Sequence, residues 1–358
     1  AHDLSEQVPT FGRHLNRLGS DIGSVDPEAL LASVVLDLEE LTDEPYFLVL
    51  DEYDASEKAN DVQEFLESLL RNLPPNCQII INSRTLPRLP WIAMIAQNEA
   101  IILSDNHLIT NDPYRMESDG VLGELTVNCL GPNSIAKNGQ LIESWEGHLP
   151  RLLFIFALER PVVTRSEICQ AFWPTLDNDQ AVNVFHVTKR RLHKALGFDA
   201  LIHQDGYYQV NPGVRIHYDV TEFVSALLQG RITGGEFRSE AWQRAIELYR
   251  GPFLQGHSES WIVQQREAYQ RAYLEAIMAI ANIRLEENRP EHALRLLTQA
   301  SGENTDFEPL HREIMKLYAR LGRRSEAASH YQSLEETLHE RGTAPSPETR
   351  RLYDELMS

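Results

Sequence analysis

The order of hydrophobic patterns between residues 148 and 210 constrains the fold of this chain more than any other feature. Three stretches have the 3.6-residue period of amphipathic helices, at residues 148–159, 165–172 and 179–196. Two short apolar stretches come next, at residues 201–203 and 207–210, on either side of a turn that contains Gly206. Three helices followed by a hairpin is the order of elements in a winged helix, so we expect this fold here.

Changes of pattern divide the rest of the chain. Residues 111–120 are polar and punctuated by proline and glycine, which is typical of a linker. Residues 1–110 alternate helical and strand patterns, with apolar strands at 46–50 and 77–81, which predicts a partial, P-loop-like α/β domain with a parallel sheet of buried strands. Alternation at residues 125–129 predicts a small antiparallel sheet before the three helices, so the α+β winged-helix domain spans residues 121–217.

The last segment, residues 218–358, is predicted to be all-α and contains a repeat. The sequence of residues 289–294 recurs at residues 323–328, a shift of about 34 residues, which is the period of tetratricopeptide (TPR) repeats. Ala293 and Ala327 occupy equivalent positions, where neighbouring helices need a small side chain to approach closely. We therefore expect two stacked, TPR-like helix pairs, with two unrelated amphipathic hairpins as the alternative.

The net charge of −20 argues against nucleic-acid binding only if the charge is evenly spread. It is not, because residues 1–120 hold 7 basic and 22 acidic side chains, whereas residues 121–217 hold 9 of each. The segment with the predicted winged helix is therefore neutral overall, and its charge does not exclude DNA as a partner.

Two other classes of protein are disfavoured. The longest apolar stretch, residues 152–158, is far shorter than the ~20 residues of a membrane span, so we expect no membrane partner. The three cysteines, Cys77, Cys129 and Cys169, are isolated, which argues against a disulfide framework and against a zinc site. The first residues show no signal-peptide pattern, and together these observations predict a cytoplasmic protein.

The helix predicted at residues 179–196 has two chemically different faces. One face carries the apolar stripe expected to face a core, made of Ala181, Phe185, Thr188, Leu192 and Leu196. The other carries candidate DNA-binding residues, namely Asn183, His186, Val187, Arg190 and Lys194, with Lys189 and Arg191 on its flanks. Arginine can bond guanine and asparagine can bond adenine in the major groove, while the remaining cations suit phosphates. The alternative is a basic face that is merely solvated.

Three further residues are candidates around this helix. Arg165, at the start of the preceding helix, is placed to add a phosphate contact, although a plain surface role explains it equally well. His203 and Gln204, near the hairpin turn, are candidates for approaching a minor groove. We expect Tyr207 and Tyr208 not to stack on bases, because alternate residues of the hairpin strand must pack on the helices.

Ordered motifs over residues 121–358 carry a family resemblance. Residues 125–132, Trp145 and residues 161–167, 172–174 and 183–196 resemble the OmpR-type winged helix of SARP-type transcriptional activators. The helical segment resembles the bacterial transcriptional activator domain (BTAD) of the same regulators, at residues 218–220, 249–254, 322–327 and 345–349. The resemblance implies binding to double-stranded promoter DNA, often as a homodimer, and recruitment of RNA polymerase. Lys189 departs from the pattern, since family members usually have an apolar residue there.

A second resemblance concerns residues 47–52, in which four apolar residues run into Asp51 and Glu52. This is the Walker B pattern, in which the aspartate holds Mg²⁺ and the glutamate polarises water. With Arg84 after the next strand, the segment resembles the nucleotide-binding domain of maltose-activator-type (STAND) regulators, which implies Asp51, Glu52 and Arg84 as vestigial nucleotide-binding residues.

No Walker A sequence, G-x-x-x-x-G-K-[ST], accompanies it, because none of the five lysines is preceded by a glycine. Either the phosphate loop lay further upstream in a longer parent chain, or the domain is a degenerate scaffold. We therefore expect no ATP hydrolysis by this chain, no catalytic residues, no metal site and no required cofactor, with ATP and Mg²⁺ relevant only to a longer parent chain.

The sequence thus predicts a DNA-binding transcriptional activator. The third helix and the wing would read promoter DNA, and the TPR-like domain would serve dimerisation or contact with RNA polymerase. Two alternatives remain open: a nucleotide-switched STAND signalling ATPase, and a protein-interaction scaffold that uses the concave helical surface.

Overall fold

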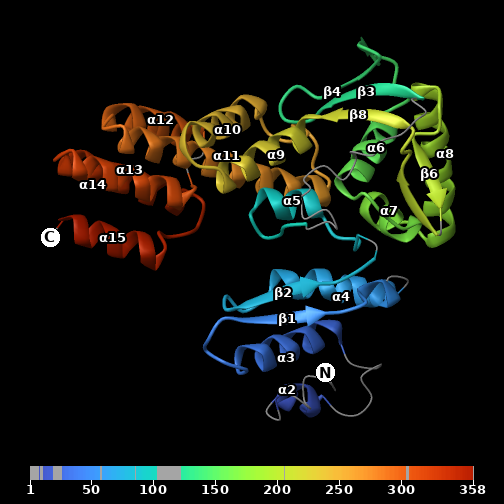
Figure 1. The fold of residues 1–358 in the computed structure, drawn as a ribbon, viewed down its shortest axis with the longest axis horizontal. Coiled ribbons are helices and arrows are strands. Elements are labelled where there is room, and N and C mark those ends of the chain that lie inside the picture. The colour runs from blue at the N-terminus through green and yellow to red at the C-terminus, as the bar shows by residue number, and fades with distance from the viewer. Residues whose placement is uncertain are drawn as a thin grey trace. The chain divides into compact units, whose positions relative to one another are not determined.

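The computed structural model describes residues 8, 11–18, 26–56, 59–84, 86–102, 122–204, 206–303 and 306–357. The chain forms two compact units, Ala1–Leu89 and Pro90–Ser358, called unit 1 and unit 2 below (Figure 1). The linker predicted at residues 111–120 lies outside the described residues. Unit 1 ends at Leu89 and not at residue 110 as predicted, because the next helix belongs to the core of unit 2.

Unit 1 contains the two strands at the residues where the sequence places them. Its elements are α2 (Arg13–Arg17), α3 (Pro27–Glu39), β1 (Tyr46–Leu50), a 3-10 turn (Tyr53–Ser56), α4 (Asn60–Arg71) and β2 (Cys77–Ile81). The strands pair in parallel, with Tyr46 opposite Cys77 and Leu50 opposite Ile81. The predicted strand–helix–strand unit with parallel strands is therefore present.

The expectation that both faces of these strands are buried is wrong. Tyr46, Leu48 and Ile79 pack against α3 and α4, in a cluster centred on Leu38 and Leu69. Successive side chains of a strand point to opposite faces. Phe47, Val49 and Ile80 accordingly point the other way, and 64%, 57% and 47% of their surfaces are exposed. The continuous apolar pattern thus forms a two-stranded sheet that is covered on one face.

Unit 2 begins with α5 (Trp91–Ala96) and continues in an α+β part, residues 122–218. Its sheet has the strand order β5-β4-β3-β8, and the three predicted helices and the hairpin lie within one residue of their predicted positions. The elements are β3 (Gly123–Asn128), β4 (Ser134–Lys137), β5 (Gln140–Leu141), α6 (Leu149–Glu159), α7 (Arg165–Phe172), α8 (Asn178–Leu196), β6 (Leu201–Gln204), β7 (Tyr207–Val210) and β8 (Val214–Tyr218).

The sheet differs from the predicted antiparallel one in its last strand. β4 and β5 pair antiparallel as expected, but β8 runs parallel to β3, from Gly123 opposite Val214 to Val127 opposite Tyr218. Parallel neighbours need a long crossover connection, and here the three helices and the hairpin provide it. The chain thus returns to the sheet immediately before the helical part begins.

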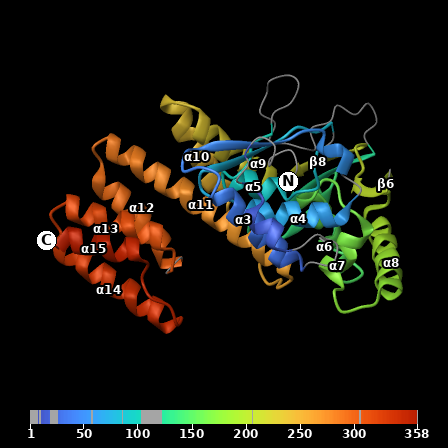
Figure 2. The ribbon, with the colours of Figure 1, turned by 90° about the horizontal axis from the view of Figure 1, so that it is seen from below.

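The helical part, residues 219–357, consists of successive antiparallel helices (Figure 2). They are α9 (Asp219–Ile232), α10 (Gly235–Leu248), α11 (Ser260–Glu286), α12 (Pro290–Glu303), α13 (Glu308–Arg320), α14 (Arg324–Glu340) and α15 (Pro347–Met357). Ala293 and Ala327 are fully buried, as the repeat requires. In the described part of the chain, no helix combines the length and the hydrophobicity that a membrane span needs.

One hydrophobic core runs from the α+β part into the helical part. It joins Leu152 of α6 and Tyr218 of β8 with Phe223, Phe253 and Tyr269 of the helical part. The rings of Phe253 and Tyr269 meet edge to face, 5.2 Å apart. The segments predicted as separate domains, residues 121–217 and 218–358, therefore pack as one unit.

Close packing of α9 on α10 depends on Gly230. A Cβ atom at this position would lie 2.6 Å from two ring atoms of Trp242 in α10. Because a buried ring cannot move without disturbing its neighbours, we expect Gly230→Ala to lower the free energy of unfolding of unit 2 by ~1–3 kcal/mol. Urea denaturation followed by tryptophan fluorescence measures this change.

The matched control is Gly302→Ala in α12, where an added Cβ meets nothing within 4 Å. Alanine has the higher helix propensity, so this control should leave stability unchanged or raise it slightly. Equal losses in both variants would contradict the role assigned to Gly230.

Candidate nucleic-acid interface

Helix α8 is fixed at both ends and along one side. The Asp177 side chain caps its first turn by accepting a hydrogen bond from the Gln180 backbone nitrogen (2.8 Å). The helix ends at Gly197, whose φ of 78° is left-handed, a conformation that favours glycine. All five residues of the predicted core stripe are at most 3% exposed: Ala181, Phe185, Thr188, Leu192 and Leu196. The rotation of α8 about its axis is therefore set by the core.

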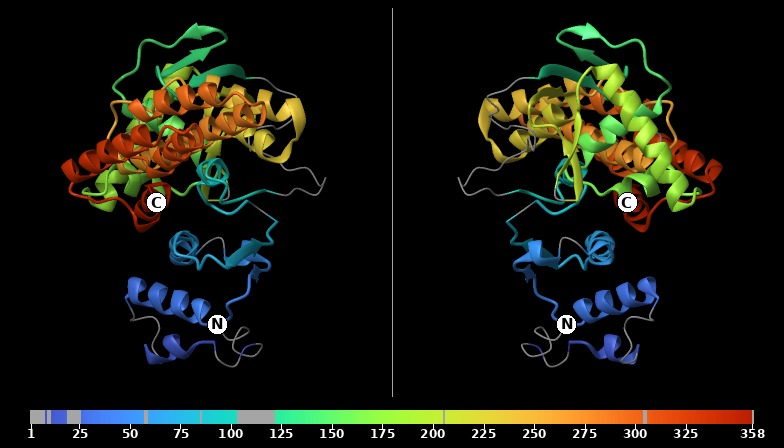
Figure 3. Two further views of the ribbon diagram at one scale, coloured as in Figure 1. Left: turned by 90° about the vertical axis from the view of Figure 1, so that its left-hand side faces the viewer. Right: turned by 90° about the vertical axis from the view of Figure 1, so that its right-hand side faces the viewer.

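The opposite side of α8 faces outward at the edge of unit 2 (Figure 3). Asn183, His186, Val187 and Arg190 are exposed there, and 44% of the Val187 surface is accessible. Within the described residues, the side chains of Asn183 and Arg190 have neither a hydrogen bond nor an ion pair with any other group. This row, called the outer row below, thus presents an amide, an imidazole, a methyl-bearing side chain and a guanidinium to an external partner.

Lys189 lies half-buried between this row and the hairpin. Its ammonium is 5.8 Å from the ring centroid of Tyr208, which is within range of a cation–π contact. Tyr208 is buried and packs edge-on against Phe185 at 4.9 Å. The cationic side chain is therefore accommodated by lying over an aromatic ring with its charge near the surface.

Arg165 is exposed at the first residue of α7 and lies near the same tyrosine. Burial raises the pKa of Tyr208, and the positive charge of Arg165 acts in the opposite direction. The backbones of Val163 and Tyr208 exchange two hydrogen bonds, of 3.0 and 2.7 Å, which attach the hairpin to the start of α7. The structure thus brings Arg165 and Lys189 together around the hairpin.

The N-terminus of α7 already has an internal partner. Thr164 caps it by accepting a hydrogen bond from the Glu167 nitrogen, and the Glu167 carboxylate accepts from the Thr164 nitrogen at 2.6 Å. The helix end is therefore filled by the protein's own carboxylate. A phosphate at this place would have to be held by the Arg165 side chain.

The hairpin carries the remaining candidates. His203 and Gln204 are exposed on β6; the His203 ring lies 4.7 Å from the Tyr208 ring, and the Gln204 side-chain oxygen accepts a hydrogen bond from Gln209 (3.3 Å). The expectation that alternate residues of this strand pack on the helices agrees with the structure, in which Tyr208 is buried and Tyr207 is partly buried. His203 and Gln204 thus stand on the surface beside Lys189 and Arg165.

Sequence reasoning missed one residue of this surface, Glu146. Its carboxylate accepts a hydrogen bond from the Lys194 ammonium, and its other oxygen lies 3.5 Å from Arg191 Nε. The hydrogen bond with Lys194 lowers the pKa of Glu146. Because Glu146 precedes these residues by more than forty positions, no local pattern could have indicated the contact. Arg191 and Lys194 are therefore exposed but paired.

The candidate nucleotide residues lie in unit 1, at the carboxyl ends of β1 and β2. Asp51 Oδ1 accepts hydrogen bonds from Asn82 Nδ2 (2.7 Å) and from the Glu52 nitrogen (3.0 Å). Glu52 has a left-handed φ of 49°, and the Arg84 nitrogen donates to Asp54 (3.3 Å). Among the residues described, no group of three or more His, Cys, Asp or Glu side chains could hold a metal ion.

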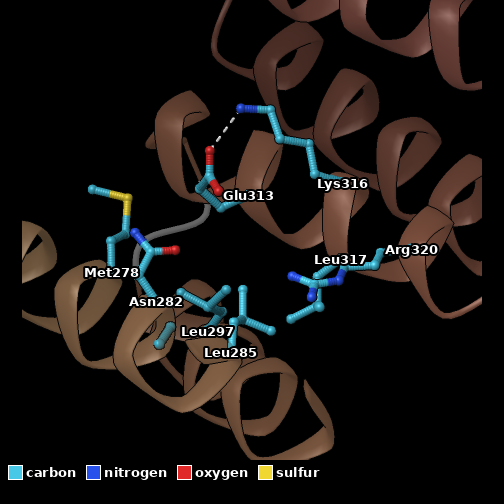
Figure 4. Close-up of a pocket in the computed structure, with 9 residues that line it drawn as sticks. Met278, Asn282, Leu285, Leu297, Glu313, Lys316, Leu317 and Arg320 are labelled. Carbon is cyan, nitrogen blue, oxygen red and sulfur yellow. Dashed lines mark hydrogen bonds and ion pairs between the residues drawn. The ribbon is translucent and has the colours of Figure 1, made fainter. Parts of the chain in front are cut away.

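The helical part contains a pocket of about 210 Å³ between α11, α12 and α13 (Figure 4). Met278, Leu285 and Leu297 contribute apolar side chains to it. Lys316 stands at its rim, where its ammonium is paired with Glu313 at 2.8 Å. None of the residues of α8 or of the hairpin lines this pocket.

Comparisons with known proteins bear on unit 2. Residues 219–357 match the family model of the bacterial transcriptional activator domain. The regulatory protein AfsR of Streptomyces griseus is 24% identical over 239 residues, which are 65% of this chain and 24% of that protein. The chain thus spans about a quarter of the length of this relative.

The fold is similar to that of EmbR from Mycobacterium tuberculosis, whose structure was solved in complex with a low-affinity phosphopeptide. The superposition has a TM-score of 0.52 and 21% sequence identity, and covers 66% of this chain and 65% of EmbR. At this identity the similarity concerns the fold alone.

Proposed function

We propose that this chain, whose residues 219–357 are a bacterial transcriptional activator domain of the kind found in SARP-type regulators, is a transcriptional activator that binds double-stranded promoter DNA. In this proposal residues 121–217 act as an OmpR-type winged helix, with α8 as the reading helix and the β6–β7 hairpin as the wing. The observation that carries the proposal is the outer row of α8, because its side chains are exposed on a helix whose opposite side is locked into the core.

The dimensions and the chemistry of α8 suit a major groove. Its 19 residues extend for about 28 Å, and a single helix fits a groove about 12 Å wide. Arg190 can donate two hydrogen bonds to a guanine, Asn183 can bond an adenine, and Val187 can contact a thymine methyl. Lys189 and Arg165 would hold phosphates on either side of the hairpin, and His203 and Gln204 would approach the minor groove.

The helical part supplies the second half of the proposed function. Since α9, α10 and α11 share one core with the α+β part, a contact made by the helical part is coupled through this core to the position of α8. We propose that its TPR-like surface contacts RNA polymerase or a second copy of the chain, as the resemblance to SARP-type regulators implies. The proposal includes no catalytic reaction, no cofactor and no metal; ATP and Mg²⁺ would matter only in a longer parent chain.

The test is DNA binding by Arg190→Ala and Asn183→Ala. A duplex is first selected by the wild-type chain from a random-sequence library, and affinities are then compared at one fixed salt concentration. Loss of a good base contact costs ~1–3 kcal/mol, so each variant should bind about 5- to 150-fold more weakly and tolerate changes at one base pair.

Arg295→Ala is the matched control, because Arg295 is also an exposed helical arginine but lies on α12. It should bind the selected duplex like the wild type. If Arg190→Ala and Asn183→Ala also retain wild-type affinity, α8 is not the reading helix and the proposal fails.

A further inference from the structure

The basic side chains along α8 fall into two groups that differ in their partners. Arg190, which belongs to the outer row, has no carboxylate partner within the described residues. In the last two turns, Arg191 and Lys194 share Glu146, and the His193 ring lies 3.0 Å from Asp199. The protein therefore pairs Arg191 and Lys194 with its own carboxylate and leaves the outer row open.

Glu146 is held in place by the turn between β5 and α6. The neighbouring Trp145 packs against the core and donates its indole N–H to the Ile142 carbonyl at 2.9 Å. Gly147, on the other side, has a left-handed φ of 85°, and its nitrogen donates to the Trp145 carbonyl at 2.9 Å. The carboxylate thus comes from an ordered turn that points it at α8.

Stability does not explain this arrangement. Glu146 and Arg191 are each 48% exposed and Lys194 is 73% exposed, and ion pairs at such exposure contribute little to folding. Their effect on an approaching polyanion is larger, because each cation that neutralises a phosphate releases counterions and strengthens binding of any DNA sequence. A cation that is already paired with a carboxylate contributes less to this non-specific binding.

We propose that Glu146 is a specificity-determining residue of the DNA-binding surface. By pairing with Arg191 and Lys194 it weakens attraction to the phosphate backbone. It does not pair with the outer row, whose hydrogen-bond donors therefore remain available to read bases. Glu146 thereby raises the ratio of promoter affinity to non-specific affinity. This inference rests on the proposed function, since it concerns the same helix and the same ligand.

The experiment compares Glu146→Gln with Glu143→Gln. Glu143 lies in the same turn region, is exposed and has no ion-pair partner among the described residues, so both variants remove one negative charge at nearly the same place. Binding to the selected duplex and to a scrambled duplex is measured by fluorescence anisotropy between about 50 and 200 mM salt. Melting curves of both variants verify that they are folded.

We expect Glu146→Gln to bind the scrambled duplex about tenfold more tightly at low salt, with a log–log salt slope steeper by up to about 2. Affinity for the selected duplex should rise less, so the specificity ratio falls. Glu143→Gln should leave both quantities at their wild-type values.

Two results would overturn the inference. Identical behaviour of Glu146→Gln and Glu143→Gln would show that the pairing with α8 has no effect on DNA. Weaker binding of Glu146→Gln to both duplexes would show that Glu146 supports the position of α8 and does not restrain it. Failure of the proposed function is distinguishable from both, because then Arg190→Ala and Asn183→Ala would retain wild-type affinity.

Discussion

Removing residues 1–96 is expected to destabilise unit 2 by several kcal/mol, whereas removing residues 1–89 should leave its stability nearly unchanged. The difference is the six-residue helix α5, in which five residues are buried and four of them, Ile92, Ala93, Ile95 and Ala96, belong to the core of unit 2. Burying one large apolar side chain stabilises by ~1.5–3 kcal/mol, so loss of this helix should cost on the order of 5 kcal/mol.

Arg231 of α9 adds a polar attachment to the same helix. Its guanidinium donates to the carbonyl oxygens of Ile95 (2.8 Å) and Ala96 (2.6 Å) at the end of α5, and it also pairs with Glu275 of α11. Removal of residues 1–96 would leave the mostly buried Arg231 side chain without these two acceptors, which adds to the loss of stability.

Urea denaturation followed by fluorescence tests the prediction, because four tryptophans, Trp145, Trp173, Trp242 and Trp261, lie in unit 2 and remain in both truncated chains. A point variant avoids the loss of a whole helix: Ile92→Ala should lower the free energy of unfolding by ~2–5 kcal/mol. Ile101→Ala, at a position that is 56% exposed, should change stability by less than about 0.5 kcal/mol. Equal midpoints for the two truncated chains would contradict the assignment of α5 to unit 2.

The same helix shows why the domain boundary could not be predicted from the sequence. The helices at residues 165–172 and 179–196 could be predicted because each has a polar face and an apolar face, which produces a period. Five of the six residues of α5 are buried, so its sequence has no polar face and no period, and the sequence pattern places the boundary beyond it, at residue 110. A short helix buried on all sides is not distinguishable from a buried strand by periodicity alone.

The other differences between the prediction and the structure arise from contacts between segments that are distant in the sequence. The parallel pairing of β8 with β3 joins residues 91 positions apart, and Glu146 meets Lys194 across 48 positions. In the candidate interface, the core stripe and the outer row could be predicted from the helical period alone. Which cations of α8 are paired with carboxylates depends on a turn that precedes the helix by two other helices, and only the three-dimensional structure brings them together.

A buried carboxylate links the two parts of unit 2 and should make stability depend on pH. Glu159, at the end of α6, is 1% exposed and accepts hydrogen bonds from the hydroxyls of Tyr218 and Tyr269 and from the Gln265 amide (3.1 Å). Burial raises the pKa of Glu159 to about 7; the charge of Asp219 acts in the same direction, and the hydrogen bonds from the two tyrosines act against it. The protonated form is therefore favoured in the folded chain.

The sign of the effect is set by proton linkage. An unfolded glutamate has a pKa near 4.3, so as the pH rises from about 5 to about 7 the unfolded chain has released a proton that the folded chain retains. The free energy of unfolding should thus be highest below the unfolded pKa and fall until the pH passes the folded pKa. Between about pH 5 and pH 8, the free energy of unfolding of the wild type should fall by about 2–3 kcal/mol relative to that of Glu159→Gln.

Comparison of the two proteins isolates this group. His257 and His330 have lowered pKa values, so at acid pH they make the free energy of unfolding rise with pH. Both chains contain them, so this contribution cancels when the wild type is compared with Glu159→Gln. Denaturation midpoints are measured across the pH range by tryptophan fluorescence, with the exposed Glu143→Gln as a control that should behave like the wild type. Parallel profiles for the wild type and Glu159→Gln would contradict the prediction. Diverging profiles would show that the junction between α6 and α11 weakens as Glu159 ionises.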